Sequence, residues 1–441
     1  MENYLKALDK KTRQMIRLIS RQADGLHLRA YLIGGVVRDI LLKKKNLDLD
    51  VIVEGDVTRL AYVLARKWKK ARVIFHQQFG TASIVVPAGI CIDLASTRKE
   101  EYGYSGALPT VRPGRLEDDL HRRDFTINAM AIAINRTSFG ELHDRFGGIN
   151  DLAEKKIRIL HGQSFVDDPT RILRAVRFEQ RLCFRIERWT GSLIKDAIDK
   201  KIVNHVKPQR YFKELKKILC EAEPVKMLRR LQTIGWLPLF RSPKDINLRA
   251  LNFMHFRIQK IRRKPFYHQV TCWWLVYFLG MVAQCQKRAV NKLLSDIHFT
   301  KIERRSIDQM LDTKGLLAQL SCKKLSSSQV YQILRPLNPV VVAYLRIVTS
   351  REMIARRLDR FVRKDQHIRL QITGKDLKRL GMGAGKAMGS VLEKILYWKI
   401  DRNIRTQREE LNLALLILKK TGITPSGVNG RKLTIGANRK N

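Results

Sequence analysis

Residues 31–53 read YLIGGVVRDILLKKKNLDLDVIV, and this stretch decides the fold of the first third of the chain. The apolar run ending at Gly34–Gly35 predicts a strand closed by a glycine turn and, after a short helix, a second strand over 49–53. On a strand, residues two apart point to the same side, so Asp48 and Asp50 present two carboxylates to one point. Magnesium prefers oxygen ligands of this kind and often needs only one or two carboxylates plus substrate phosphates.

The glycine turn itself suits a phosphate group. Gly34 and Gly35 let the backbone approach a phosphate closely, and Arg38, on the short helix over 37–42, can supply a cationic fork to a triphosphate. The alternative for an isolated DxD pattern is a tight turn with two solvated aspartates. The glycine and arginine element just upstream favours the ligand site.

The α/β pattern continues to about residue 150 and then changes. A helix over 57–70, a strand pair over 83–87 and 90–94, and an apolar segment over 125–134 complete the predicted head. The Gly, Pro and Tyr content of 98–112 indicates a flexible loop. Beyond residue 151 apolar residues recur at helical spacing, and the predicted helices include 172–181, 209–220, 224–233, 291–311, 328–333 and 390–398.

The charge balance indicates a polyanionic partner. The 441 residues contain 86 Lys plus Arg against 41 Asp plus Glu, a formal net charge of +45, yet 44% of the chain is hydrophobic and can form a core. Nucleic acid is the favoured partner; an anionic membrane surface is the alternative for the charge alone, and the motifs described below make a membrane partner unexpected. Basic residues cluster over 257–264 and again over 356–364. Each cluster is either a solvated helix face or part of an extended surface that binds RNA phosphates.

No targeting or membrane-spanning segment is expected. The most apolar stretch, 270–285, is shorter than the roughly 20 residues of a spanning helix and predicts a buried core helix. The first residues lack the apolar core of a signal peptide. The six scattered cysteines fit reduced thiols in a cytoplasmic protein.

A second chemical pattern begins at Asp168. Asp168 before Pro169 predicts a helix N-cap with proline in the first helical position. The same helix places Arg171, Arg174 and Arg177 three residues apart on one broad face. Such a row is either a solvated face or a ligand site.

These patterns together resemble one family, the class II tRNA nucleotidyltransferases and bacterial poly(A) polymerases of the polymerase-β-like superfamily. GGVVRDILL with LDLDV is similar to the family's first motif, and RRDFTINAM over 122–130 to its second. HDRFGG over 143–148 with Asp151–Leu152, DDPTRILRAVRF over 167–178, and Arg210 with Glu214 resemble the later motifs in the family's order. The resemblance covers roughly residues 25 to 240, and a shorter one over 372–385 resembles the tRNA-contacting tail.

The resemblance implies an active site. Asp48 and Asp50 are the expected catalytic residues and ligands of a two-magnesium site. Asp168 would accept from the exocyclic amine of cytosine or adenine, and Arg171 would donate to ring acceptors. The expected nucleotide-binding residues are Gly35, Arg38, Arg123, Asp168, Arg171, Arg174 and Arg177. Asp124 and Asn128 are expected to brace the fold, whereas Asp93 is a candidate third carboxylate or a structural acid.

The resemblance also implies the reaction and the architecture. An RNA 3′-hydroxyl would attack the α-phosphate of CTP or ATP, adding CCA or only its terminal A to tRNA. A poly(A) polymerase is the alternative enzyme, and a non-catalytic RNA-binding protein the alternative of another class. The expected α+β architecture is a head over 1–150, a helical neck over 151–222, a basic RNA-binding body over 223–365, a tRNA-binding tail over 366–420 and a flexible basic end over 421–441.

Overall fold

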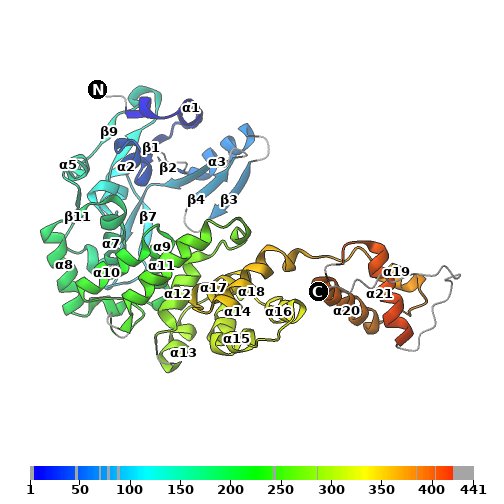
Figure 1. Ribbon diagram of the computed structural model, residues 1–441. Coiled ribbons are helices and arrows are strands. Elements are labelled where there is room, and N and C mark those ends of the chain that lie inside the picture. Colours follow the sequence, from blue (N-terminus) through cyan, green and yellow to red (C-terminus); the bar gives the residue numbers. More distant parts are fainter. Residues whose placement is uncertain are drawn as a thin grey trace. The chain divides into compact units, whose positions relative to one another are not determined.

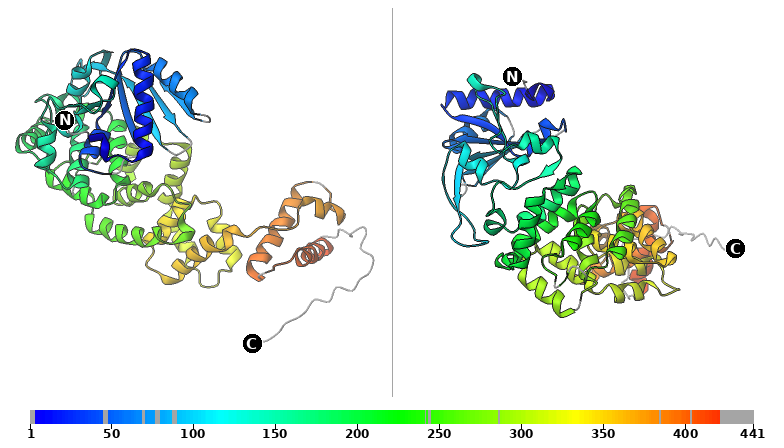
Figure 2. Two further views of the ribbon diagram at one scale, coloured as in Figure 1. Left: turned by 90° about the horizontal axis from the view of Figure 1, so that it is seen from above. Right: turned by 90° about the vertical axis from the view of Figure 1, so that its left-hand side faces the viewer.

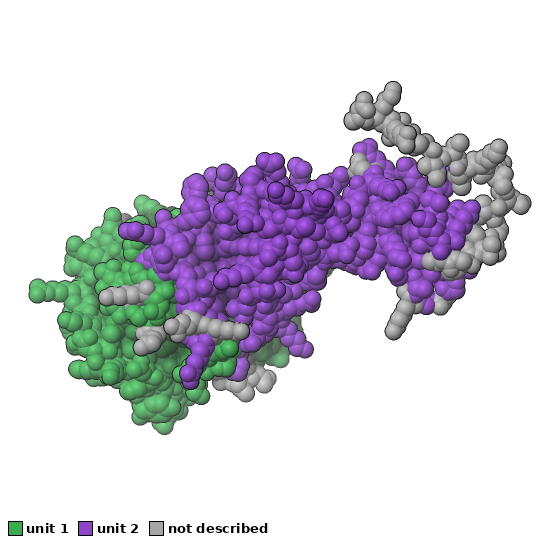
Figure 3. Space-filling model, turned by 60° about the horizontal axis from the view of Figure 1, so that its bottom comes forward, with its two compact units in different colours: residues 1–246, 291–297 green, residues 247–290, 298–441 purple. Residues whose placement is uncertain are grey.

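The computed structural model describes residues 4–44, 48–68, 71–76, 80–86, 90–240, 242, 245–285, 287–383, 385–402 and 404–420. The chain divides into two compact units, residues 1–246 with 291–297, and residues 247–290 with 298–441 (Figure 3). The expected basic end over 421–441 lies outside the described residues, and the five-part division of the chain stays a prediction.

A mixed seven-stranded sheet forms the centre of the head (Figure 1). β2 pairs in parallel with β5, and the other neighbouring strands pair antiparallel. The strands, in spatial order, are β3 (Arg72–His76), β4 (Thr81–Val85), β5 (Cys91–Ser96), β2 (Asp48–Glu54), β1 (Arg29–Ile33), β8 (Ala131–Ala133) and β9 (Leu142–His143). The predicted strands 31–35, 49–53 and 90–94 are thus confirmed to within a few residues, as is the predicted strand 83–87 up to residue 86, since residue 87 lies outside the described residues.

The two faces of this sheet have different neighbours. On one face Leu32, Val51 and Ile92 belong to a buried core that includes residues of α1 (Lys10–Gly25), α2 (Gly35–Leu41) and α3 (Val57–Lys67) (Figure 2). On the other face Ile33 and Ile52 pack with α4 (Leu116–His121). Because side chains alternate along β2, Asp48 and Asp50 lie on the α4 side.

Helices follow the head within the same unit, as the spacing predicted. α7 (Arg171–Leu182) contacts both α9 (Pro208–Cys220) and α10 (Pro224–Ile234). The remaining elements from residue 148 to 205 are α5 (Gly148–Ala153), β10 (Lys156–Ile157), α6 (Ser164–Asp167), β11 (Arg185–Ile186), α8 (Arg188–Asp199) and η5 (Ile202–His205).

The structure differs from the predicted elements in two places outside α7. Residues 98–112 are not simply a loop, because β6 (Arg98–Glu101) and β7 (Thr110–Pro113) form an antiparallel ribbon. Its first strand is held by Glu100, which accepts from Arg98 and from Arg122 of the neighbouring α4 C-cap. The predicted helix 291–311 is two helices, α13 (Lys287–Asp296) and α14 (Lys301–Leu311), since Thr300 and Glu303 form a capping box that starts a new helix.

The described part of the second unit is helical. α12 (Trp273–Val282) is buried from Trp274 onward, which confirms the core helix predicted within 270–285. Among the described helices, none combines the length and the apolar character that crossing a membrane requires. The other helices are α11 (Leu248–Arg262), α15 (Thr313–Leu320), α16 (Ser327–Leu334), α17 (Pro339–Val348), α18 (Glu352–Arg363), α19 (Gly374–Arg379), α20 (Lys386–Arg402) and α21 (Gln407–Lys420).

Candidate active site

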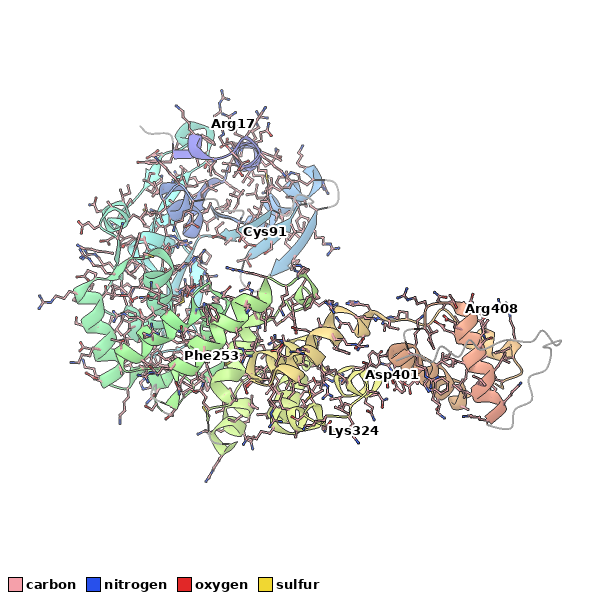
Figure 4. All side chains as sticks on the ribbon, in the orientation of Figure 1. Arg17, Cys91, Phe253, Lys324, Asp401 and Arg408 are labelled. Atoms are coloured by element: carbon pink, nitrogen blue, oxygen red, sulfur yellow. The ribbon has the colours of Figure 1, made fainter. Side chains whose placement is uncertain are left out.

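Three carboxylates lie on one face of the adjacent strands β2 and β5. The parallel register places Asp93 directly opposite Asp50, and Cys91, labelled in Figure 4, opposite Asp48. Asp93 is exposed and accepts a hydrogen bond of 2.5 Å from the Ser83 hydroxyl. Asp93, whose role the sequence left open, therefore lies beside the predicted catalytic pair.

The surroundings of Asp50 disfavour its negative charge. Burial and the neighbouring charges of Asp93 and Asp48 raise the pKa of Asp50 from 3.8 to about 6, although Arg123 and Arg38 oppose the shift. A half-buried carboxylate among like charges gains from a cation that neutralises the group.

The oxygen donors of Asp48 and Asp50 suit part of a magnesium ligand set. Within the described part of the chain, no group of three or more His, Cys, Asp or Glu side chains is arranged to hold a metal ion. Asp48 and Asp50 supply hard oxygen donors, and magnesium is commonly bound by one or two carboxylates together with substrate phosphates and water. The residues present are therefore compatible with a magnesium ion whose other ligands are phosphate and water oxygens.

The glycine turn is packed against Arg123. Gly34 has a φ of +70°, and a Cβ at this position would lie 2.5 Å from the Arg123 Nη1. Arg123 donates to Asp119 from Nε at 3.3 Å and from Nη2 at 3.0 Å, while burial lowers the pKa of Arg123. A side chain at Gly34 would therefore displace a guanidinium that Asp119 holds.

Arg38 is anchored inside the protein. Its Nε and Nη2 donate to Asp39 Oδ1 at 2.9 and 2.8 Å, and its Nη1 donates to Asn128 Oδ1 at 2.7 Å. The whole residue is 4% exposed. These contacts give Arg38 a structural role, and its contact with a triphosphate stays a prediction.

Asp124 joins the head to α7. Its carboxylate accepts from Asn128 Nδ2 at 3.0 Å and from Arg174 Nε and Nη2 at 2.8 and 2.5 Å. Burial alone would raise the pKa of Asp124, but the Arg174 charge and these hydrogen bonds lower it to about 2. The contacts are those of the bracing role expected for Asp124 and Asn128.

One aromatic ring gathers three of the predicted nucleotide-binding arginines. The guanidinium carbons of Arg38, Arg174 and Arg177 lie 5.2, 5.8 and 5.0 Å from the centre of the Phe178 ring. Phe178 itself is buried and meets Phe125 edge-on with ring centres 5.8 Å apart. The α7 arginines and the head arginine are thus neighbours, although they are far apart in the sequence.

The start of α7 differs from the prediction. Asp168 is not the N-cap with Pro169 in the first turn, because α7 begins at Arg171 and Thr170 is its N-cap. The Asp168 carboxylate instead accepts from the Thr170 amide at 3.0 Å and the Thr170 hydroxyl at 2.6 Å, which closes a turn before the helix. It also accepts from Arg210 Nη2 at 2.9 Å.

The three α7 arginines do not share one open face. Arg171 is 5% exposed and donates to the Ser164 hydroxyl at 2.6 Å and the Arg122 carbonyl at 2.7 Å. Arg174 binds Asp124, whereas Arg177 lies 3.5 Å from Glu221. A pocket of about 820 Å³ opens beside this helix, and its lining includes Asp168, Arg177, Arg181, Arg210, Lys213 and Glu214.

Sequence reasoning missed an acidic anchor for the second motif. Asp119 is fully buried and accepts from both Arg122, at 2.6 and 3.0 Å, and Arg123. Arg122 also donates to Glu100 of the β6–β7 ribbon at 3.1 Å. The spacing of three and four residues between Asp119 and the two arginines was the available signal, since such pairs meet on a helix.

Two stretches of the chain match models of protein families. Residues 30–158 match the model of the poly A polymerase head domain. Residues 183–240 match the model described as the probable RNA and SrmB-binding site of polymerase A.

Curated and solved relatives extend the similarity to most of the chain. The chain is 36% identical to the A-adding tRNA nucleotidyltransferase of Geobacter sulfurreducens over 92% of its own length and 47% of the relative. With the A-adding enzyme of Halalkalibacterium halodurans the identity is 32% over 84% of both chains. The chain thus spans about half the length of the first of these relatives and most of the second. A solved CCA-adding enzyme in an apo form matches with a TM-score of 0.67 and 31% identity, covering 94% of this chain and 98% of that one.

Proposed function

The chain belongs to the family that unites tRNA nucleotidyltransferases with poly(A) polymerases, and we propose that it extends the 3′ end of tRNA with nucleotides from ATP or CTP. The RNA 3′-hydroxyl attacks the α-phosphate of the nucleotide, a new phosphodiester bond forms, and pyrophosphate leaves. Solved neighbours described as complexes with tRNA, ATP and CTP support these substrates.

Addition of the terminal A is the favoured activity. Relatives named A-adding match 83% to 92% of this chain, whereas a relative named CC-adding matches 52% and one named multifunctional CCA protein 48%. The similarity to A-adding enzymes therefore extends well beyond the head. Addition of the complete CCA remains the second possibility for the same site.

Asp48 and Asp50 are the proposed catalytic residues and magnesium ligands. An ion held by these two carboxylates would lower the pKa of the attacking hydroxyl and neutralise charge on the leaving oxygens. The single observation that carries the proposal is the placement of these two carboxylates beside Asp93 on adjacent parallel strands. Asp93 is close enough to contribute to the charge at the same centre.

The neck is proposed to select the base. Asp168 accepts from the exocyclic amine of adenine or cytosine, and Arg171 donates to ring acceptors. Thr170 and Arg210 fix the Asp168 carboxylate, while Ser164 and the Arg122 carbonyl fix Arg171. A base without the matching donor leaves a polar group unpaired, which lowers its affinity. The proposed nucleotide contacts also include Gly35, Arg38, Arg123, Arg174 and Arg177.

Incubation of defined tRNAs with single labelled nucleotides tests the activity. The substrates end before CCA, after C and after CC, and each is offered ATP and CTP separately. Incorporation of ATP only on the tRNA ending in CC supports A addition. A long adenylate ladder on unrelated RNA would instead support the poly(A) polymerase, which the head-domain similarity keeps as the second candidate. No incorporation in any reaction would leave a non-catalytic RNA-binding protein.

The proposed compartment is the cytoplasm. The six cysteines are present as thiols, which is the state that a reducing environment maintains.

A further inference from the structure

The segment that contains α11, α12 and most of α13 has an unusual charge composition. Between Ile246 and Ser295 there are nine Lys or Arg residues and no Asp or Glu. The stretch itself therefore contains no acid, although Asp245 and Asp296 border it and its Lys264 donates to Asp359 of α18 at 2.7 Å. A field of one sign attracts ligands of the opposite charge.

α11 is amphipathic, with one side buried and the opposite side exposed. Leu251, Met254, Ile258 and Ile261 are buried, as expected for the side that packs on the core. On the opposite side, and at the C-cap, the residues at helical spacing are exposed. These residues, here called the α11 stripe, are Arg249, Phe253, Phe256, Lys260 and Arg263. The stripe is about 21 Å long at 1.5 Å per residue.

The two rings of the α11 stripe are the unexpected part. Phe253 is 62% exposed and Phe256 is 69% exposed, although they face away from the core (Phe253 is labelled in Figure 4). Phenylalanines three residues apart on a helix are neighbours, so they form one apolar patch between Arg249 on one side and Lys260 and Arg263 on the other. Exposed apolar patches rimmed by charge commonly mark binding surfaces.

Phe253 lies against a guanidinium that is itself anchored. The guanidinium carbon of Arg257 lies 5.4 Å from the centre of the Phe253 ring. Arg257 is itself fixed, because its Nη2 donates to the Thr349 carbonyl at 2.6 Å. A ring that is oriented in advance loses less entropy when a flat ligand stacks on it.

We propose that the α11 stripe binds unpaired RNA, with bases stacked on Phe253 and Phe256 and phosphates held by Arg249, Lys260 and Arg263. Single-stranded nucleic acid combines stackable bases with a negatively charged backbone, which is the chemistry that rings between cations recognise. A second copy of this chain would bring like charge to the same surface. The inference rests on the proposed function only in that RNA is the substrate.

The test measures RNA affinity separately from nucleotide addition. The probes are a short fluorescein-labelled oligoadenylate and an RNA duplex of the same length, titrated with the full chain and followed by fluorescence anisotropy. In Phe253→Leu/Phe256→Leu the apolar area is kept but the stacking surface is lost. Oligoadenylate binding should weaken about tenfold or more, and duplex binding by less than about twofold. Phe253→Tyr/Phe256→Tyr should bind as the parent does.

Two further variants serve as controls. Ile302→Ala removes an apolar side chain that is 69% exposed on α14, outside the stripe, and should bind both probes as the parent does. Lys260→Gln/Arg263→Gln should weaken both probes and lower the salt dependence of binding by about one to two phosphate contacts. Thermal melting of each variant confirms that it is folded.

Three results would overturn the proposal. The first is unchanged oligoadenylate binding by the leucine variant, and the second is an equal loss for single strand and duplex. The third is unchanged RNA affinity together with weaker binding of a polyglutamate probe, since the surface would then recognise an acidic protein. Asp48→Ala should bind oligoadenylate normally while adding no nucleotide, so a failure of the proposed activity is distinguishable from a failure of the α11 stripe.

Discussion

The candidate active site and the α11 stripe use positive charge in opposite ways. Around the site each arginine has an acidic or backbone anchor: Arg38 binds Asp39, Arg123 binds Asp119, Arg174 binds Asp124, and Arg171 binds Ser164 and a carbonyl. The stripe instead lies in a stretch without acidic residues. Anchored charges fix geometry, which catalysis needs, whereas a field of one sign captures a polyanion along its length.

The largest effect should come from the carboxylates of β2. Asp48→Ala should reduce AMP incorporation into tRNA at least about a thousandfold, because several kcal/mol of charge stabilisation are lost. RNA affinity should stay at the parental value, which would separate nucleotide addition at the candidate site from RNA binding at the α11 stripe. Single-turnover assays and anisotropy measure the two quantities. Parental activity in this variant would contradict the metal assignment.

Removing an anchored arginine should cost stability. Arg174→Ala leaves the buried Asp124 carboxylate without its cation and should lower the free energy of unfolding by about 3–5 kcal/mol. Arg181→Ala is the matched control, because Arg181 is half exposed and lies 3.8 Å from Glu221. Its removal should cost less than about 1 kcal/mol. Urea unfolding of both variants checks the difference.

The same pair predicts a pH signature. The pKa of Asp124 is about 2 in the folded chain, below its ordinary value of 3.8. The pair therefore stabilises the fold fully above about pH 4, and this contribution is lost as the pH falls toward 2. The stability difference between parent and Arg174→Ala should shrink over that range, and a constant difference would contradict the role given to the ion pair.

Asp119 should affect nucleotide binding through Arg123. Asp119→Asn keeps the shape but removes the charge that holds Arg122 and Arg123, and we expect kcat/KM for ATP to fall about tenfold, mostly through KM. The Asp48→Ala variant should differ by losing kcat. Glu117→Gln, two residues earlier and exposed, should behave as the parent. Equal kinetics for the Asp119 and Glu117 variants would contradict the role given to Asp119 in nucleotide binding.

The smallest effect concerns a stacked histidine. The His121 and His161 rings lie 5.0 Å apart, and burial, Arg171 and His121 lower the pKa of His161 from 6.5 to about 4. The unfolded chain takes up a proton near pH 6.5 and the folded chain does not, so stability falls as the pH drops from 6.5 to 4. In His161→Gln, the melting temperature should change by about 2 °C less over this pH range than it does in the parent. His268→Gln, an exposed control, should leave the pH dependence unchanged.

Local sequence patterns predicted the secondary-structure elements better than they predicted which elements pair with one another. The alternation of Asp48, Leu49 and Asp50 gave the strand and its two faces, because that periodicity is a property of a few consecutive residues. The partner of Asp50 could not be obtained in this way, since the pairing of β2 with β5 is non-local. The break before α14 was readable in the sequence, where Thr300 and Glu303 have capping-box spacing, but continuous apolar periodicity favoured one helix.

The sequence predicted which residues belong to the candidate site better than it predicted which of their side chains are exposed. Arg171, Arg174 and Arg177 follow helical spacing, yet Arg171 is buried because Ser164 and the Arg122 carbonyl come from other segments. The 98–112 ribbon was missed for the same reason. Its anchor is Arg122, which lies outside the stretch that looked like a loop.

The parallel register of β2 with β5 also concerns how the protein folds. Asp50 and Asp93 face each other across strands 43 positions apart in the sequence, and parallel neighbours cannot be joined by a tight hairpin. Contacts of such separation form late and slowly, and a slip by one residue would turn Asp93 to the opposite side of the sheet. During refolding, catalytic competence should therefore be regained after most helical signal has returned, which makes enzyme activity itself a late kinetic probe of correct strand registration.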